Sequence, residues 1–270
     1  MRLSTKITLG IMGGVFLISL LFIIGFSFTD RKNSVRQDRQ VTISQDNLVP
    51  IEIGEFKTVS IDYLSEKSGH DIYIDGCLFV KPTATESNKQ ELLVSEEVRK
   101  YINTLTTNDT LFIRFDWKQM NKDLANANGS SSFRVVHDVN YYLNTSVVDI
   151  ISNTDMVKIN IQDIKTDHIK VCTTEEILIN SCEAVSVTPS GNNFKIQNST
   201  IHTLNLDLDK VRGWNVENCS IQEENLTGSG NHRNTISKSE TKVMNWIPKD
   251  KDARLNLEIV GGEPARFTFK

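Results

Sequence analysis

The sequence predicts an all-β protein, in which a single N-terminal transmembrane helix is followed by a single-stranded, parallel β-helix-like solenoid with coils of about 18–20 residues. Three observations predict it. One uncharged apolar segment lies near the N-terminus, short apolar-polar alternations fill the remainder, and three similar strings recur in the second half. The expected organisation is a short tail at residues 1–6, a transmembrane helix at 7–28, a polar tether at 29–49 and a β-rich domain at 50–270.

The apolar segment runs from Ile7 to Phe28 and carries no charge over its whole length. At about 1.5 Å per residue it reaches about 33 Å, enough to cross a hydrocarbon core of about 30 Å. The alternative is a cleaved signal peptide, because the start is basic and Gly25 and Ser27 fit a signal peptidase site. The length of the run favours an uncleaved anchor that binds the lipid bilayer.

Two sequence signals conflict over the side of the membrane on which the domain lies. Four basic residues follow the apolar segment and two precede it, which favours a cytoplasmic domain by the positive-inside rule. A signal-like start that leads into a long polar domain is, however, the ordinary form of an exported chain. We therefore expect a single-pass membrane protein with a periplasmic or extracellular domain.

The charge balance argues against one class of partner. The chain has 30 Lys plus Arg against 34 Asp plus Glu. Residues 1–40 contribute 6 of the basic and 2 of the acidic residues, which leaves 24 basic and 32 acidic residues beyond them. Such an acidic domain repels phosphate backbones, so no nucleic-acid partner is expected.

Beyond Pro50 the dominant pattern is that of strands. Apolar and polar residues alternate from Val59 to Tyr63 and from Leu111 to Phe115. Only one stretch has helical spacing, which begins after a capping Ser95 and extends to Leu105. The polar run at residues 126–132 is predicted to be a loop.

The repeat lies between about residue 152 and residue 230. The strings Ile-Asn-Ser-Cys, Gln-Asn-Ser-Thr and Glu-Asn-Cys-Ser align at Asn180, Asn198 and Asn218. Their spacing suits one coil of a β-solenoid, in which equivalent positions stack about 4.8 Å apart. The three asparagines are therefore predicted to form a structural ladder of side-chain amides.

The same stacking accounts for two of the four cysteines. Cys182 and Cys219 are expected to point inward on coils two apart, about 9–10 Å from each other, too far for a disulfide. A sandwich of hairpins is the competing all-β fold, but the turn dipeptides Asp75-Gly76 and Asn128-Gly129 lie outside the repeat. Residues 242–270 are expected to close the solenoid, with Trp246, Phe267 and Phe269 supplying the bulk.

This layout resembles the GIN domain found in the heads of auto-transporter adhesins, which occur in envelope proteins of Bacteroidetes-type bacteria. The resemblance rests on four stretches and the coils, and covers residues 50–269. The stretches are Val59-Ser60-Ile61-Asp62-Tyr63, Asp71-Ile72-Tyr73-Ile74, Leu92-Leu93-Val94 with the segment to Ile102, and Asn108-Asp109-Thr110-Leu111-Phe112-Ile113. It implies an extracytoplasmic β-solenoid of adhesive or unassigned function, with no family catalytic residues to carry over.

No motif for catalysis, metal binding or cofactor binding is present. There is no Gly-x-Ser-x-Gly, P-loop, GxGxxG or HExxH. The five histidines are scattered and are interpreted as solvated or structural: His70, His137, His168, His202 and His232. Asp207 and Asp209 point to the same face of a strand, where a solvated acidic face is favoured over weak calcium binding. No catalytic residue, metal site or cofactor is therefore predicted.

The favoured function is a non-catalytic binding or adhesion module that presents a flat polar surface to a glycan or a protein. The first alternative is a β-solenoid enzyme acting on polysaccharide, which requires Asp163, Asp167, Asp207 and Asp209 to meet in space. The second is an envelope structural or signalling component, whose helices would pair through Gly10 and Gly14.

Overall fold

The computed structural model describes residues 39–63, 76–83, 90–128, 133–136, 139–154, 157–237, 240–260 and 266–269. The chain divides into two compact units, residues 1–39 and residues 40–270, and the second is described here. None of the helices within these described ranges is both long and apolar enough to cross a membrane. The predicted anchor between Ile7 and Phe28, and the Gly10 and Gly14 pair within it, lie outside the described residues.

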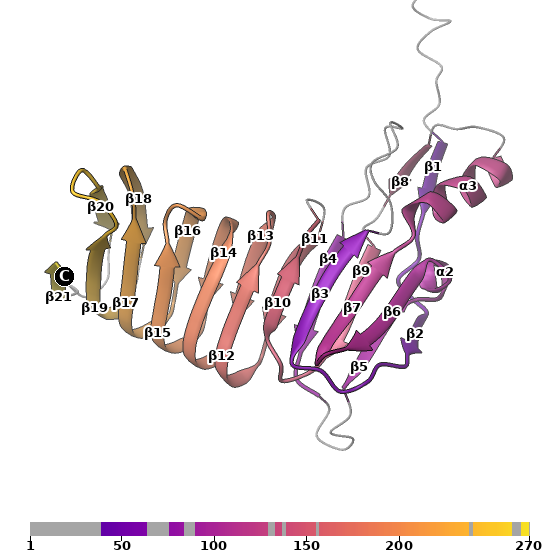
Figure 1. The fold of residues 1–270 in the computed structure, drawn as a ribbon, viewed down its shortest axis with the longest axis horizontal. Helices are drawn as coiled ribbons and strands as arrows, with labels where there is room; N and C mark the ends of the chain where they lie inside the picture. The colour runs from indigo at the N-terminus through magenta and orange to yellow at the C-terminus, as the bar shows by residue number, and fades with distance from the viewer. Residues whose placement is uncertain are drawn as a thin grey trace, which may run out of the picture. The chain divides into compact units, whose positions relative to one another are not determined.

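The unit is an all-β solenoid, as the sequence predicts, and its elements begin with a region of mixed strand direction (Figure 1). The elements of this region are β1 Arg39–Thr42, β2 Leu48–Ile51, β3 Thr58–Tyr63, β4 Gly76–Lys81, β5 Glu91–Ser95, α2 Glu96–Arg99, β6 Ile102–Thr107, β7 Thr110–Phe115, α3 Trp117–Asn128, β8 Phe133–Val136, β9 Val139–Asn144 and β10 Asp149–Ser152.

The second half contributes the regular coils. Their strands are β11 Val157–Gln162, β12 Lys165–Cys172, β13 Glu176–Asn180, β14 Glu183–Gln197, β15 Thr200–Asp207, β16 Val211–Glu217, β17 Ser220–Gly228, β18 Asn231–Ser237, β19 Glu240–Pro248, β20 Arg254–Val260 and β21 Arg266–Phe269.

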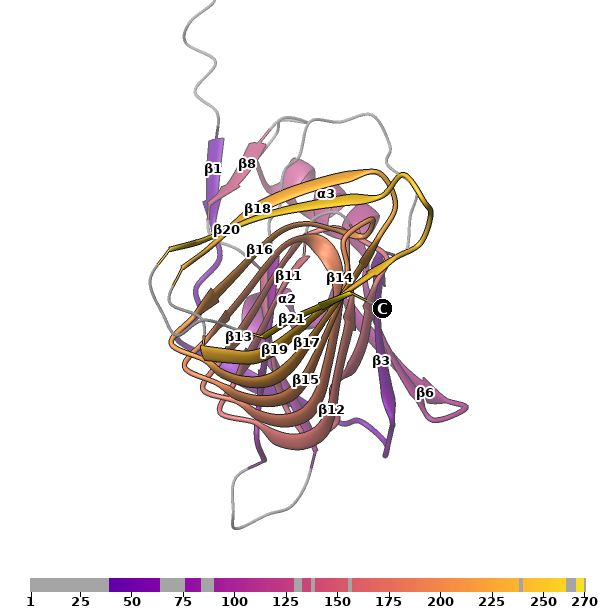
Figure 2. The same ribbon diagram turned by 90° about the vertical axis from the view of Figure 1, so that its left-hand side faces the viewer.

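Each coil places one strand in each of two facing sheets (Figure 2). In sheet I the parallel order is β7-β3-β10-β12-β14-β15-β17-β19-β21. In sheet II it is β9-β4-β11-β13-β14-β16. β18 and β20 form a separate parallel pair. The coils differ in length, since Glu183 lies opposite Thr200 early in the solenoid whereas Val243 lies opposite Arg266 near its end.

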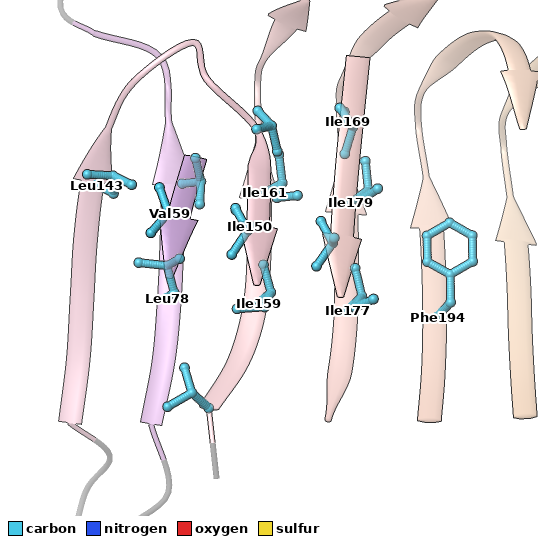
Figure 3. Packing of buried hydrophobic residues seen from close by; sticks show 14 of the residues in the cluster. Val59, Leu78, Leu143, Ile150, Ile159, Ile161, Ile169, Ile177, Ile179 and Phe194 are labelled. Carbon is cyan, nitrogen blue, oxygen red and sulfur yellow. The ribbon is translucent and has the colours of Figure 1, made fainter. Parts of the chain in front are cut away.

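Alternation within the strands builds the core between the sheets. In β11 the inward side chains Val157, Ile159 and Ile161 are buried while their neighbours face outward. Ile159 lies beside Ile177, and Ile177 lies beside Phe194, so equivalent side chains stack along the solenoid (Figure 3). Burial of these stacked columns is the main stabilising contribution, at about 25 cal/mol per Å² of apolar surface.

The corner that leads from sheet II to sheet I has one conformation in four coils. Asp163, Ser181, Asn198 and Asn218 all have a φ between 53° and 57°. Asparagine and aspartate tolerate this left-handed region better than other side chains, which explains their recurrence at the corner. Within β14 the change of sheet needs no turn. It occurs at Gly191, where a Cβ would lie 2.9 Å from the Glu175 carbonyl oxygen.

The solenoid extends beyond the predicted limits of about 152 and 230. β3 and β4 already belong to the parallel sheets, although they lie early in the chain. The predicted tether at 29–49 is also too long, because β2 begins at Leu48, pairs with β5, and follows the buried Ile43. This end of the predicted tether belongs to the fold because Ile43 is buried and β2 pairs with β5.

Two helix predictions need correction. The helical spacing after Ser95 gives only the single turn α2, because residues 102–107 form β6 and pair antiparallel with β7. The helix α3 was not predicted, and its last residues occupy the start of the predicted loop. Asp116 caps it, since its carboxylate accepts the backbone N–H of Gln119 at 2.9 Å, and Met120 is buried.

The predicted closing layer at the C-terminal end is only partly formed. Trp246 is buried, but Phe267 is 38% exposed and Phe269 is 79% exposed. Both phenylalanines are in register with buried residues of β19, Met244 and Trp246. They therefore continue the core columns, and no further layer of the described residues covers them.

Candidate functional site

Two adjoining hollows lie on the outer face of sheet I. The larger has a volume of about 760 Å³ and is lined mainly by residues of β12, β14 and β15. The smaller has a volume of about 520 Å³ and includes Lys57 and residues 147–149. Both are lined by Ser146, Thr166 and Asp167, so they form one continuous surface, which we call the sheet I groove. Volumes of about 300–1,000 Å³ are typical of ligand sites.

A local distortion of the strands produces this surface. In β14 the buried residues Ala184 and Val187 are three apart, and in β15 the buried residues Ile201 and Leu204 are three apart. Two consecutive side chains consequently face outward in each coil, and the register advances equally on neighbouring strands, so the coils share this feature. The strands bend at this point, and the first residue of each outward pair lines a shelf in the larger hollow.

Four side chains from four coils follow one another along the shelf. Asp167, Val185, His202 and Gln222 each come directly after residues that pair across the coils. Equivalent positions on neighbouring parallel strands are about 4.8 Å apart. The groove therefore presents a carboxylate, an apolar side chain, an imidazole and an amide in a row, and Val185 is 50% exposed.

The charges around the groove are balanced. Lys165 Nζ lies 2.7 Å from Glu183 Oε2, and this hydrogen bond raises the pKa of Lys165. Lys170 Nζ lies 3.7 Å from Asp149 Oδ2. Exposed pairs of this kind contribute about 0–1 kcal/mol, so a ligand can displace them at little cost. The groove suits an uncharged or mixed-charge polar ligand better than a polyanion.

The histidines divide between two environments. His168 lines the smaller hollow and His202 lines the larger one, on β12 and β15, so these two share the outer face of sheet I. His232 lies elsewhere, where its Nε2 is 2.7 Å from the Ser229 carbonyl oxygen and 3.2 Å from Asp209. His70 and His137 lie outside the described residues. No group of three or more metal-ligating side chains occurs in the part of the chain that the structure describes.

The predicted asparagine ladder has one member, Asn180, that is not at the position equivalent to the other two. Asn198 Nδ2 donates to Asn180 Oδ1 at 2.9 Å, so these two amides do meet. The register, however, pairs Asn180 with Gln197, and Ser181 is the residue that shares the left-handed corner with Asn198 and Asn218. The first string is thus shifted by one residue relative to the alignment proposed from the sequence.

A second column of amides was missed by the sequence reasoning. Asn225 Nδ2 donates to Asn205 Oδ1 at 3.0 Å, and Asn245 Nδ2 donates to Asn225 Oδ1 at 2.8 Å. The hydroxyl of Thr268 donates to Asn245 Oδ1. These positions are in register on β15, β17, β19 and β21. The equal spacing of the three asparagines along the chain was a signal that the sequence already contained.

The four aspartates proposed for an enzyme are not brought together. Asp163 is at a corner, and Asp167 lies near the beginning of β12. Asp207 is the last residue of β15, and Asp209 follows it in the turn. Only Asp207 and Asp209 are close, and the ammonium of Lys249 lies between them, with its Nζ 2.8 Å from Asp209 Oδ2. The ammonium of Lys249 therefore occupies the position between these two carboxylates, where weak calcium binding was considered.

Lys249 also lowers the pKa values of Asp207 and Asp209. Its hydrogen bond, together with the backbone N–H of Ser229, holds the pKa of Asp209 below its usual range. Burial alone would raise the pKa of Asp207, but Lys249 and the backbone N–H of Asp209 lower it overall. Carboxyls with a lowered pKa stabilise the folded state above the unfolded value, and this contribution is lost as pH falls through the folded value.

Replacement of Lys249 by methionine is therefore expected to lower Tm by a few degrees at pH 7, because the two carboxylates lose the ammonium that lies between them, although Lys210 Nζ stays 3.5 Å from Asp207 Oδ2. The native protein should lose stability as pH falls below about 3.8, and the variant should lose less over that range. Thermal unfolding followed by circular dichroism measures both. If the variant lost as much stability at acid pH as the native protein, this role of Lys249 would be contradicted.

The cysteines are free thiols in the structure, as expected for Cys182 and Cys219. Both are buried, and burial raises the pKa of each thiol. The thiol of Cys182 donates to the Asn180 carbonyl oxygen at 3.3 Å, and that of Cys219 to the Glu217 carbonyl oxygen at 3.2 Å. They fill the inside of the corner, where burial favours the neutral thiol over the thiolate.

Comparisons with known proteins give structural similarity alone. No protein-family model matches the sequence, and no curated protein matches it. Among solved structures, a candidate adhesin from Bacteroides fragilis is 13% identical with a TM-score of 0.48, over 84% of this chain and 100% of that one. A candidate adhesin from Parabacteroides merdae is 13% identical with a TM-score of 0.32, over 86% and 98%.

A third solved structure is described as a candidate lipid-binding protein, from Parabacteroides distasonis. It is 10% identical with a TM-score of 0.32, over 85% of this chain and 100% of that one. At such identities and TM-scores the similarities assign neither a ligand nor an activity. The function is therefore argued from the chain's own surface.

Proposed function

We propose that the chain is a non-catalytic binding module that holds a polar glycan along the sheet I groove. The observation that carries the proposal is the row of Asp167, Val185, His202 and Gln222 across four stacked coils, inside a continuous pair of hollows. Carboxylate, imidazole and amide groups together donate and accept hydrogen bonds, as a ligand rich in hydroxyl groups requires. The exposed Val185 offers an apolar contact for the face of a sugar ring.

The shape of the surface also favours a chain-like ligand. The groove crosses several strands, so its polar groups recur with the repeat of the coils rather than converging on one point. Repeated shallow contacts favour an extended polymer over a small molecule enclosed on all sides. Of the aspartates named for hydrolysis, only Asp207 and Asp209 are close to each other, and the ammonium of Lys249 lies between them.

The proposal includes a location and a family. The domain is held at the bacterial envelope by the segment from Ile7 to Phe28 and lies on the periplasmic or extracellular side, with the layout of a GIN domain. The support is the length of the uncharged segment and the signal-like start of the chain. Protease treatment of intact cells and of spheroplasts tests the side, since a cytoplasmic domain would survive both treatments.

The binding test uses the full chain in lipid nanodiscs on an array of neutral and acidic oligosaccharides. The native protein is expected to retain at least one class of glycan, and the double variant Asp167→Ala/His202→Ala to bind it at least about tenfold more weakly. Lys158→Ala is the matched control, because Lys158 is exposed on the outer face of sheet II. Equal binding by the double variant, or retention of no glycan, would contradict the proposal. Capture of a protein at the groove in place of glycan would do the same.

A further inference from the structure

The C-terminal end of the solenoid exposes apolar side chains that continue the columns of the core. Phe267 and Phe269 continue the columns of the buried Met244 and Trp246, yet they are 38% and 79% exposed. Their rings pack on each other with centroids 5.9 Å apart. Val260, at the end of β20, is 52% exposed. These three side chains place most of the large exposed apolar groups of the described residues at one end.

The same end carries two open strand edges. Within the described residues, β21 pairs with β19 alone, and β20 pairs with β18 alone. A strand edge next to exposed aromatic side chains is a template for pairing with another chain. At the opposite end of the solenoid the sheets finish differently, because β5 and β6 turn back as antiparallel strands.

We propose that this end is the interface of a dimer in which two copies of the chain stack end to end. A two-fold axis normal to the facing sheets reverses strand direction and keeps each sheet in its own layer. It therefore pairs β20 with β20 of the second copy and β21 with β21 of the second copy, both antiparallel. Each copy covers the Phe267 and Phe269 rings of the other.

The charges along β20 indicate that the partner of this strand edge is a second copy of the chain. Arg254, Asn256 and Glu258 alternate along β20 and are all exposed. In an antiparallel pair centred on Asn256, Arg254 of each copy lies opposite Glu258 of the other. Opposite charges at facing positions stabilise a strand pair, and the arrangement is self-complementary only when the two strands are identical.

The test measures the mass of the full chain in detergent by sedimentation equilibrium. A dimer is expected for the native protein. Phe269→Glu should raise the dissociation constant at least about thirtyfold, because it buries a charge in an aromatic contact. Leu105→Glu is the matched control, since Leu105 is 55% exposed on β6 at the other end and should leave the dimer unchanged.

A charge exchange separates this interface from any other contact between copies. Glu258→Arg alone places arginines opposite each other and should weaken the dimer about tenfold, whereas Arg254→Glu/Glu258→Arg should restore it. Both side chains are exposed, so these variants fold even if Phe269→Glu does not. A monomeric native protein, a dimer insensitive to Glu258→Arg, or failure of the double exchange to restore it would overturn the proposal.

Discussion

Replacement of Glu224 by leucine is expected to raise the free energy of unfolding by about 3 kcal/mol at pH 8. Glu224 is fully buried in β17, in register with Leu204 and Met244, so it interrupts an apolar column. Its Oε2 accepts from the Thr241 hydroxyl at 3.2 Å, whereas its Oε1 is buried without a hydrogen-bond partner among the described residues. A leucine of similar size would continue the column.

The pH dependence of this effect has a definite sign. Burial raises the pKa of Glu224 from 4.5 to about 7. Between these values the folded state holds a proton that the unfolded state has lost, so native stability falls as pH rises and is constant above about 7. A rise of this size corresponds to about 3 kcal/mol at about 1.36 kcal/mol per pH unit.

The measurement is urea unfolding of native and variant protein at several pH values between 5 and 8. The stability difference should grow across that range in favour of Glu224→Leu. Glu176→Gln, at an exposed carboxylate of β13, is the matched control and should show no such trend. A difference that is independent of pH would show that Glu224 is ionised at all these values, which contradicts its burial as a neutral acid.

Replacement of Phe194 by alanine is expected to cost about 3–5 kcal/mol of stability. Phe194 is 2% exposed in the sheet II part of β14, with Ile177 beside it on one coil and Trp214 on the next. Its loss leaves a cavity that three coils share. Because coils contact only their neighbours, the loss should be greatest in β13 to β16.

Hydrogen exchange followed by mass spectrometry checks both the size and the place of this effect. Amides of β13 to β16 should exchange faster in Phe194→Ala, whereas those of β4 and β9 should keep native rates. Phe79→Ala is the matched control, because Phe79 is only partly buried and stacks on Tyr142 at 5.1 Å, a contact worth about 1 kcal/mol. A uniform loss of protection in every strand would contradict a coil-by-coil fold.

The fold class was accessible from the sequence because its signals are local. Alternation of apolar and polar residues marks single strands, and β3 and β7 lie where the alternations at 59–63 and 111–115 predicted them. The corner asparagines revealed the repeat because a left-handed backbone restricts the residue type. The slip at Asn180 arose because neighbouring corner residues have similar side chains, so identity alone did not set the register.

The order of the strands could not be obtained in this way. β3 lies between β7 and β10, and β4 lies between β9 and β11, so the chain enters the middle of the sheets and then builds outward in both directions. Nothing in a single strand specifies which edge its neighbours occupy. The open C-terminal end was also hidden, because Phe267 and Phe269 have the pattern of core residues whether or not a further layer covers them.

The groove was only partly foreseeable. A polar outer face follows from the alternation of apolar and polar residues along each strand. The hollow itself needs one outward residue at the bend of each coil and the loop with Ser146, which comes from a segment before the regular coils. Both depend on how the coils stack and not on any local motif.

The most direct test of the proposed site is a hydrogen-exchange footprint of the full chain with the oligosaccharide selected on the array. The sheet I groove should be protected, with slower exchange of amides around Thr166–His168 in β12, Ala184–Ser186 in β14 and Ile201–Thr203 in β15. Protection confined to β11, β13 and β16 of sheet II, with no change along the groove, would contradict it.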